Sequence, residues 1–575
     1  MHVMPQNKSA FEWTRVFAAA WFVAAVYIVV SMFTAAYYMA DTNDYANAVL
    51  AYEAGSSRYF WDFGHLFWVP LGWLLTSILG PVTRTFVNDN PRANVILVFM
   101  IVNWIAGLCS VLILRAILTN FTDRLWIINS VCVFFIFSQA FLNFSQTGCA
   151  YIPGLALLLG GLYVLISFAD KPSSAWKAGL IAGLALTAAV CMWFLFGLGV
   201  PAVMLSPILL FGWNRNSRKL VFTTAVVAGL SLAIAYLLVV VGVLHITTVA
   251  GFKAWVADAS HDTDISGVTR MVFGFARSFI YMGNDGVVFK RYLLHDPFNP
   301  VSLSDLLRLS VWKLLLFYGF LAAIGINLLL SAAGRRVLLF LCLAVGSVLV
   351  FAVFFDGGAI ERYLPLYPAL FIAFAVSLAS EKSLRFLKYT AVVFGVAMVL
   401  SDTLAMAKPL LDRRQEVTTA RVSELHGRMK PNSRVMLVSW QDDLVNFSRS
   451  FPFSPLNRSG ELNIGALVTP GTTIVTDWRK TFAAETIKAW DQNGEMWISR
   501  RVTNPQPRAE WNWVEGDDRR VSWTDFYQFF SQLQLGDTAG GDDGFILVPR
   551  TPQNRQFLEN QLNRTGNLAI GISRI

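Results

Sequence analysis

The sequence predicts a polytopic α-helical membrane protein that carries a separate α/β domain in its C-terminal part. Of its 575 residues, 55% are hydrophobic and only 14% are charged, against about 25% charged in ordinary soluble domains. Uninterrupted apolar runs recur along the first 400 residues, and about 20 helical residues cross a bilayer core that is roughly 30 Å thick. After Leu411 these long runs end, and a different architecture begins.

Hydropathy predicts about eleven transmembrane helices. The first run, Phe17 to Ala40, is about twice as long as the apolar region of a secretory signal, so we expect an uncleaved span. The other ten spans are expected at 94–114, 125–142, 150–168, 175–196, 197–213, 219–244, 309–331, 336–354, 363–380 and 386–405.

The segment from His65 to Gly80 is apolar, but it is short and contains Pro70, which removes a helix hydrogen bond. Basic residues are enriched in short cytoplasmic loops, and this rule indicates whether segment 65–80 crosses the membrane. If 65–80 does not cross, one side of the membrane collects fourteen Lys and Arg residues against four acids, whereas a crossing would turn the basic stretches 213–219 and 334–336 outward. We therefore predict that 65–80 lies in or dips into the outer interface.

This topology gives a transmembrane domain over 1–410, with a first outer loop at 41–92 and a second at 247–308. In the remaining region, 411–575, the β-type stretches "SRVMLVSW", "GTTIVTDW", "GEMWISRR" and "DGFILVPR" alternate with the helical stretches "TFAAETIKAWDQ" and "WTDFYQFFSQLQ". The alternation predicts an α/β domain of about 160 residues outside the cytoplasm. All five cysteines lie in or beside expected spans, so no disulfide framework is predicted. We expect a multi-pass protein of a bacterial inner membrane.

Charge placement excludes several classes of function. The net charge of +9 comes mostly from the inner loops, because residues 411–575 hold 20 bases and 19 acids, and this is no nucleic-acid footprint. Lys313 and Asp402 lie near the ends of expected spans, which disfavours a carrier that relays ions through mid-membrane charges.

The stretch "ADTNDYANAVLAYEAG" follows the first span directly and places Asp41 and Asp44 at the outer rim of the membrane. A carboxylate there can act as general base on an acceptor hydroxyl or amine while a lipid holds the leaving group. The alternative is that these acids have no chemical role. Bases are enriched on the inner side of the membrane, so acids are more frequent in the outer loops.

The order of motifs resembles the GT-C superfamily of integral membrane glycosyltransferases, which includes protein O-mannosyltransferases, aminoarabinose transferases and oligosaccharyltransferases. The resemblance rests on "DTNDY" after the first span, "GHLFWVPLGWLLTSILG" in the first outer loop and "ERYLPLYPALFIAFAV" near the last spans, and it covers about residues 10–405. It implies a polyprenyl-phosphate-linked sugar donor, membrane lipids around the chain and an acceptor that is a glycan, a lipid or a protein. Such donors need no nucleotide site.

The resemblance also implies roles for residues of the first outer loop. Asp41 matches the leading Asp of the acidic motif, which is the proposed catalytic base, and Tyr45 matches its aromatic residue. Thr42 replaces the usual Glu, which leaves Asp44 as a rival base or as a second acid for the acceptor or a metal. His65 takes the His position of a second motif, so Tyr45 and His65 are expected to bind substrate.

Basic residues of later segments are expected to bind the donor phosphate. The guanidinium of Arg362, beside Glu361 in "IERYLP", suits a phosphate leaving group. The alternative is an interfacial anchor that pairs with Glu361 or Asp356, and Glu361 is otherwise expected near the substrate. Lys290 and Arg291 of the second outer loop are expected at the phosphate as well, or else on a solvated helix face.

Histidine and aspartate pairs at 261–262 and 295–296 do not form a metal-binding signature. No metal ligand and no cofactor is therefore assigned, and a divalent metal stays an open alternative. The predicted function is transfer of a sugar from a polyprenyl-phosphate donor on the outer face of the membrane. Two other classes are considered: a lipid-linked glycan flippase with an outer binding domain, and an O-antigen ligase or polymerase.

Overall fold

The computed structural model describes residues 10–39, 41–57, 59–87, 90–169, 171, 174–259, 267–282, 302–307, 311–380, 385–439, 463–468, 478–503, 523–541 and 544–563. The chain divides into two compact units. The first comprises residues 1–295 and 300–412, and the second comprises 296–299 and 413–575.

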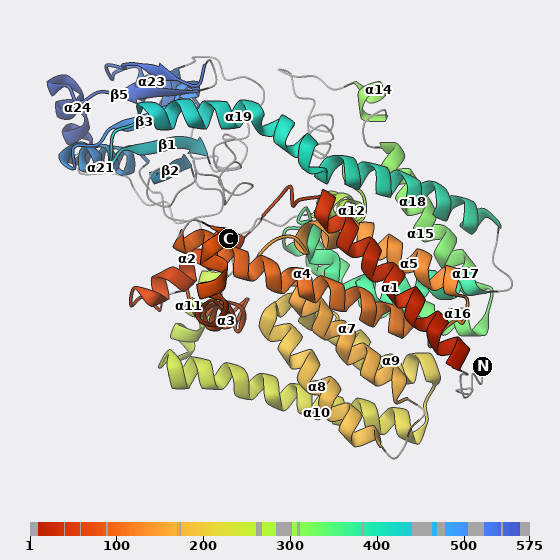
Figure 1. Cartoon of the computed structure of the whole chain (residues 1–575). Helices are drawn as coiled ribbons and strands as arrows, with labels where there is room; N and C mark the ends of the chain where they lie inside the picture. Colours follow the sequence, from red (N-terminus) through yellow and green to blue (C-terminus); the bar gives the residue numbers. More distant parts are fainter. Residues whose placement is uncertain are drawn as a thin grey trace. The chain divides into compact units, whose positions relative to one another are not determined.

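Helices build the first unit (Figure 1). In chain order they are α1 (Ala10–Phe33), α2 (Thr42–Glu53), α3 (Trp68–Thr83), η1 (Arg84–Phe86), α4 (Pro91–Leu118), α5 (Leu125–Phe137), α6 (Gln139–Phe144), α7 (Tyr151–Ser167), α8 (Ala175–Met192), η3 (Phe194–Leu198), α9 (Val200–Phe211), α10 (Arg215–Leu237), η4 (Leu238–Val243), α11 (Val249–Ala259), α12 (Gly267–Arg277), α14 (Leu303–Leu306), α15 (Trp312–Leu329), α16 (Ala332–Phe354), η6 (Ile360–Leu366), α17 (Tyr367–Ala379) and α18 (Arg385–Met406). α19 (Lys408–Arg428) runs across the division between the units.

Within the described residues, eight helices are long and apolar enough to cross a membrane. Three shorter apolar helices, 20–33, 125–137 and 151–167, coincide with further expected spans. The fold class is confirmed: the chain is a multi-pass α-helical membrane protein. α10 illustrates the lipid-facing surface, because Phe222, Leu230 and Ile234 are exposed along it and such an apolar face is stable only in contact with lipid. α3 is 16 residues long and is not among the eight.

Close helix packing in this unit depends on small residues. α8 packs on α10, and a Cβ atom at Gly183 would lie 2.7 Å from Cβ of Val227. The same contact contains a hydrogen bond between the hydroxyls of Thr187 and Ser231 at 2.6 Å. Small residues and hydroxyl pairs are typical of helix contacts in lipid, where no hydrophobic force drives two helices together.

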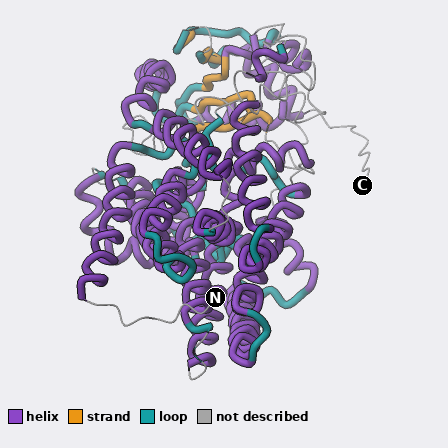
Figure 2. Tube along the Cα trace, turned by 90° about the vertical axis from the view of Figure 1, so that its right-hand side faces the viewer, coloured by secondary structure: helices purple, strands orange, loops and turns teal. Residues whose placement is uncertain are grey.

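The second unit contains the strands, which Figure 2 draws in orange. β1 (Arg434–Ser439) pairs in parallel with β2 (Asn463–Val468) and with β3 (Met496–Ser499). β5 (Phe545–Val548) pairs antiparallel with β3 and with β4 (Thr538–Ala539). The sheet order is β2-β1-β3-β5-β4.

The helices of the second unit are α21 (Trp478–Asp491), η8 (Arg500–Thr503), α23 (Trp523–Phe530) and α24 (Pro552–Asn563). α21 packs on the parallel strands, and its buried Phe482 and Trp490 share a core with Phe530 and Val548. Three of the predicted strand stretches form β1, β3 and β5, whereas β2 and β4 were not predicted. The fourth stretch, 471–478, lies outside the described residues except for Trp478, which begins α21.

Candidate active site

The segment that leads from α1 to α2 is fixed before it reaches Asp41. The backbone N–H groups of Tyr37 and Tyr38 donate to Oδ1 of Asn143 at 3.1 and 3.3 Å, and Nδ2 of Asn143 donates back to the Tyr38 carbonyl at 2.8 Å. Asn143 belongs to α6 and is buried. One amide side chain therefore holds three backbone groups of a segment more than 100 residues away.

The start of α2 is locked against the turn between α6 and α7. Oγ1 of Thr42 accepts from the backbone N–H of Gly148 at 3.0 Å and donates to the Met39 carbonyl. Nε1 of Trp68, in α3, donates to the Gly148 carbonyl at 3.0 Å. A Cβ atom at Gly148 would lie only 2.7 Å from Cγ2 of Thr42, so this approach requires glycine.

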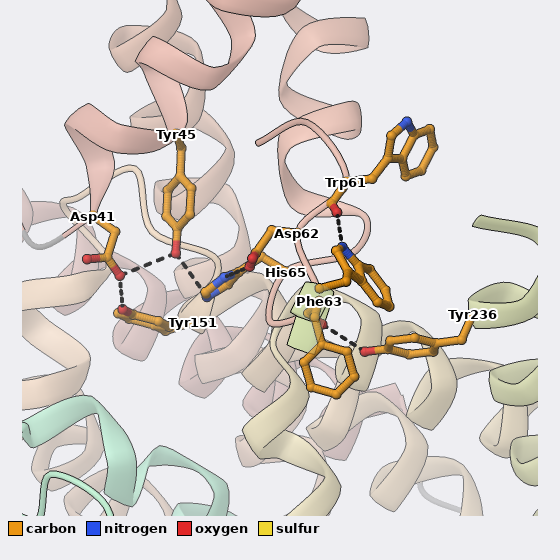
Figure 3. A network of polar contacts seen from close by, with 9 residues as sticks. Asp41, Tyr45, Trp61, Asp62, Phe63, His65, Tyr151 and Tyr236 are labelled. Atoms are coloured by element: carbon orange, nitrogen blue, oxygen red, sulfur yellow. Dashed lines mark hydrogen bonds and ion pairs between the residues drawn. The ribbon is translucent and has the colours of Figure 1, made fainter. Parts of the chain in front are cut away.

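Asp41 is the N-cap residue of α2, but its side chain makes no capping hydrogen bond, although an Asp at this position usually accepts from the first turn. Its Oδ2 atom instead accepts from the hydroxyl of Tyr151 at 2.8 Å and lies 3.4 Å from the hydroxyl of Tyr45 (Figure 3). Oδ1 makes no hydrogen bond within the described part of the chain. Asp41 thus presents a carboxylate that is oriented through Oδ2 and whose other oxygen is unpaired among the described residues.

The hydrogen bonds continue from Tyr45 to His65 and Asp62. The Tyr45 hydroxyl lies 2.9 Å from Nε2 of His65, and Nδ1 of His65 lies 2.9 Å from Oδ2 of Asp62. Both ring nitrogens of His65 are therefore engaged inside the protein. Substrate binding through His65, which the resemblance implies, would require one of these hydrogen bonds to break.

The turn that carries Asp62 and His65 is supported on its other side. Nε1 of Trp255, in α11, donates to the Trp61 carbonyl at 2.9 Å, and the hydroxyl of Tyr236, in α10, donates to the Phe63 carbonyl at 3.0 Å. Figure 3 shows the Phe63 and Tyr236 rings beside the network. Two backbone carbonyls that flank Asp62 are thus held by neighbouring helices.

Burial raises the pKa of the Tyr45 phenol well above its usual range, and the charge of Asp41 raises it further. Asp44, in the first turn of α2, also raises this pKa but less than Asp41 does, and its side chain is exposed. Burial likewise raises the pKa of the Cys149 thiol, with additional contributions from the charges of Asp41 and Glu361. Both carboxylates therefore lie near Cys149, which brings Glu361 into the neighbourhood of Asp41.

Arg362 reaches the same neighbourhood through aromatic contacts. Its guanidinium carbon lies 4.8 Å from the ring centroid of Phe355 and 5.8 Å from that of Trp193. The Trp193 ring in turn contacts the Tyr151 ring, with centroids 4.5 Å apart. Among the described residues no ion pair joins Arg362 to Glu361 or Asp356, and Nε of Arg362 has no hydrogen-bond partner.

The other expected site residues lie outside the described residues. These are Lys290 and Arg291, together with the histidine and aspartate pairs at 261–262 and 295–296. In the part of the chain that the structure describes, no group of three or more His, Cys, Asp or Glu side chains could hold a metal ion.

No protein-family model and no curated protein matches the sequence. Solved structures do match: ArnT from Cupriavidus metallidurans in the apo state superposes with a TM-score of 0.53 at 11% sequence identity, covering 96% of this chain and 99% of ArnT. The chain has a fold similar to that of ArnT. This similarity concerns the fold alone, and the expected polytopic helical membrane fold is confirmed.

Other solved structures match less well. ArnT bound to undecaprenyl phosphate has a TM-score of 0.49 at 11% identity and covers 94% of this chain and 98% of ArnT. The apo oligosaccharyltransferase of Archaeoglobus fulgidus has a TM-score of 0.46 at 13% identity, with 91% of this chain and 73% of that chain covered. The arabinofuranosyltransferase AftD from Mycobacteria has a TM-score of 0.46 at 14% identity, with 92% and 38% covered.

Asp62, Tyr151 and Trp193 contact the site but were not predicted from the sequence. Asp62 precedes His65 by three residues, and a turn that brings an aspartate onto a histidine could have been suspected from this spacing alone. Tyr151 and Trp193 lie in expected spans, where aromatic residues are common. No local pattern marks them, because their roles depend on how α7 and α8 pack within the ArnT-like fold.

Proposed function

We propose that the protein is a membrane glycosyltransferase that moves a sugar from a polyprenyl-phosphate-linked donor to a glycan, lipid or protein acceptor. Asp41 is the general base of this proposal. The proposal depends on the geometry of the Asp41 carboxylate. This side chain does not cap its own helix, and Oδ2 is oriented by Tyr151. Oδ1 makes no hydrogen bond in the described part of the chain.

The fold similarity to ArnT supports the class of donor. ArnT has been crystallised with undecaprenyl phosphate, and the fold of apo ArnT covers 96% of this chain. A lipid-phosphate donor also fits a site that lies among helices of the membrane-spanning unit. The reaction would take place on the outer face of a bacterial inner membrane, which is the orientation that the positive-inside rule predicts.

The proposed reaction has one proton transfer and one leaving group. Oδ1 of Asp41 takes the proton of the acceptor hydroxyl or amine while the acceptor oxygen or nitrogen attacks the anomeric carbon of the donor. The bond between the anomeric carbon and the phosphate oxygen breaks, and polyprenyl phosphate leaves with the bonding electron pair.

Arg362 is proposed to stabilise the charge that develops on the leaving phosphate. Its Nε is unpaired among the described residues, and its guanidinium carbon lies 4.8 Å from the Phe355 ring centroid and 5.8 Å from that of Trp193, so the aromatic contacts leave Nε as a donor for the phosphate. Lys290 and Arg291 are proposed at the same phosphate. Glu361 and Asp44 are proposed to contact or orient the acceptor.

The test is sugar transfer by the purified full-length protein in nanodiscs, supplied with a panel of polyprenyl-phosphate sugars and acceptors. Asp41→Asn is expected to lower kcat by about 10²- to 10⁴-fold, the usual contribution of a general base. Asp44→Asn tests the rival carboxylate, which lies in the same first turn of α2 and is exposed; its loss of activity is expected to be smaller than that of Asp41→Asn. Folding of each variant is followed by its thermal unfolding midpoint, and donor binding is measured separately.

Loss of transfer in Asp41→Asn, with folding and donor binding retained, would support Asp41 as the base. Equal activity of both variants would reject this assignment, and a larger loss in Asp44→Asn would transfer the role to Asp44. If the wild-type protein consumes no donor but moves lipid-linked sugars across a vesicle membrane, the flippase alternative replaces the proposal.

A further inference from the structure

Five side chains form one continuous line of polar contacts that passes through the proposed base, Asp41. The line runs from Tyr151 to Asp41, then to Tyr45, His65 and Asp62 (Figure 3). We infer that Tyr45, His65 and Asp62 form a proton relay that removes the acceptor's proton from Asp41 after each transfer. The inference rests on the proposed function, in which Asp41 is the base.

The direction of the relay follows from the chemistry of Asp62. An ionised carboxylate only accepts hydrogen bonds, so the contact of 2.9 Å between Oδ2 of Asp62 and Nδ1 of His65 requires a proton on Nδ1. Neutral His65 then carries a lone pair on Nε2, which accepts from the Tyr45 hydroxyl at 2.9 Å. The Tyr45 hydroxyl has one proton, which can be donated either to Nε2 of His65 at 2.9 Å or to Oδ2 of Asp41 at the longer distance of 3.4 Å, and the shorter contact is taken as the resting one.

Before transfer, therefore, Tyr151 donates the strong hydrogen bond to Asp41 and Tyr45 donates to His65. After Oδ1 of Asp41 has taken the acceptor's proton, rotation of the carboxyl group about its Cβ–Cγ bond turns the protonated oxygen toward Tyr45. The proton is then donated to the Tyr45 oxygen, across the position where Oδ2 now lies at 3.4 Å. The Tyr45 proton then moves to Nε2 of His65, and the resulting imidazolium is stabilised by Asp62. One proton enters at Asp41 and one leaves at His65, so Asp41 returns to its ionised form.

Burial along the line fits this direction. Tyr45 and Tyr151 are almost completely buried, whereas the side chains of His65 and Asp62 are 15% and 29% exposed. The proton would thus travel from a buried hydroxyl to the end of the line that water reaches. Because the pKa of Tyr45 is raised by burial and by Asp41, its phenol stays neutral and can accept and donate at the same time.

Tyr151 provides an internal comparison. Its hydroxyl donates to Oδ2 of Asp41 at 2.8 Å and has no onward partner among the described residues, so it can orient the carboxylate but cannot pass its proton on. Other titratable groups also face the relay. Tyr151 of α7 lies beside His65, with ring centroids 6.5 Å apart, and Tyr236 of α10 lies near Asp62.

The experiment compares the full-length wild-type protein with His65→Gln under multiple turnover, in nanodiscs, as pH and buffer concentration are varied. Gln retains hydrogen-bonding groups toward Tyr45 but does not titrate between pH 5 and 8. We expect kcat of His65→Gln to fall by at least about tenfold, within the range of proton-transfer contributions, and to recover as buffer concentration rises. Wild-type kcat should be independent of buffer, and KM for donor and acceptor should change little.

A second variant keeps the inference testable if His65→Gln folds poorly. Asp62→Asn presents an amide that can donate to Nδ1, which moves the histidine proton to Nε2 and reverses the polarity of the relay. Its kcat should also fall and become buffer-dependent, with Tyr151→Phe as a control whose rate does not respond to buffer. A merely structural role of His65 or Asp62 predicts no buffer dependence.

The relay is overturned if the wild-type protein transfers sugar while His65→Gln or Asp62→Asn keeps wild-type kcat and pH profile. It is equally overturned if these variants lose activity without any response to buffer. Absence of sugar transfer by the wild-type protein would instead reject the proposed function, and the relay with it. The two failures are therefore distinguished by the wild-type reaction alone.

Discussion

A single methyl group added at Gly148 tests whether the close approach of two turns positions Asp41. Gly148 lies between α6 and α7, and its backbone N–H donates to Thr42, the residue next to Asp41. A Cβ atom at Gly148 would lie 2.7 Å from Cγ2 of Thr42 and 2.8 Å from Cβ of Phe99. Non-bonded carbon atoms pack at roughly 3.5 to 4.0 Å, so Thr42 must withdraw by about 0.8 Å.

This displacement sets the size of the expected effect. A misplacement of about 1 Å in a reacting group can cost about 100-fold in rate, so kcat of Gly148→Ala should fall by about 10- to 100-fold. Overpacking of this kind costs about 1 to 3 kcal/mol of stability, which leaves the protein folded. The assay is sugar transfer at saturating donor and acceptor, with the thermal unfolding midpoint measured in parallel.

The matched control is Gly160→Ala in α7, because nothing lies within 4 Å of a Cβ atom at Gly160. Alanine is favoured over glycine inside a helix by about 0.5 to 1 kcal/mol, so this variant should keep its activity. Adding Thr42→Ser to Gly148→Ala removes Cγ2 but keeps the oxygen that accepts from residue 148, and should restore part of kcat. Wild-type kcat in Gly148→Ala would refute the reasoning, since Asp41 would then not depend on this approach.

Two further substitutions test the phosphate contact and the anchoring of a neighbouring segment. Arg362→Lys keeps the positive charge but loses the planar guanidinium that lies over the Phe355 and Trp193 rings. We expect kcat to fall by about 10²-fold, as for other donors to a developing anion, and unchanged kinetics would remove Arg362 from the site. Asp402→Ala leaves the backbone N–H of Tyr281 without its buried acceptor, which should cost about 1 to 3 kcal/mol and lower the thermal unfolding midpoint. Asp402→Asn is its control, because the amide oxygen can still accept; equal midpoints for the two variants would contradict this account.

The predicted elements agree with the structure more closely in the first unit than in the second. In the membrane-spanning unit, helices lie at the predicted runs, because a helix that faces lipid must be apolar along its whole length and this requirement is visible in any window of the sequence. In the second unit, β1, β3 and β5 were predicted while β2 and β4 were not. β4 has only two residues and is a strand because it pairs with β5, and such pairing depends on a partner rather than on local pattern.

The class of protein and the position of Asp41 directly after the first span can be predicted from the residues alone, since hydropathy and residue order are local properties. Which atoms meet depends on the folded chain. Asp41 is oriented by Tyr151, a residue 110 positions away, and both nitrogens of His65 are already engaged by Tyr45 and Asp62. These contacts arise from the packing of α2 against the turn before α7 and against the 61–65 turn. No periodicity along the chain encodes such packing, because hydrogen bonds between distant residues depend on the positions of several helices at once.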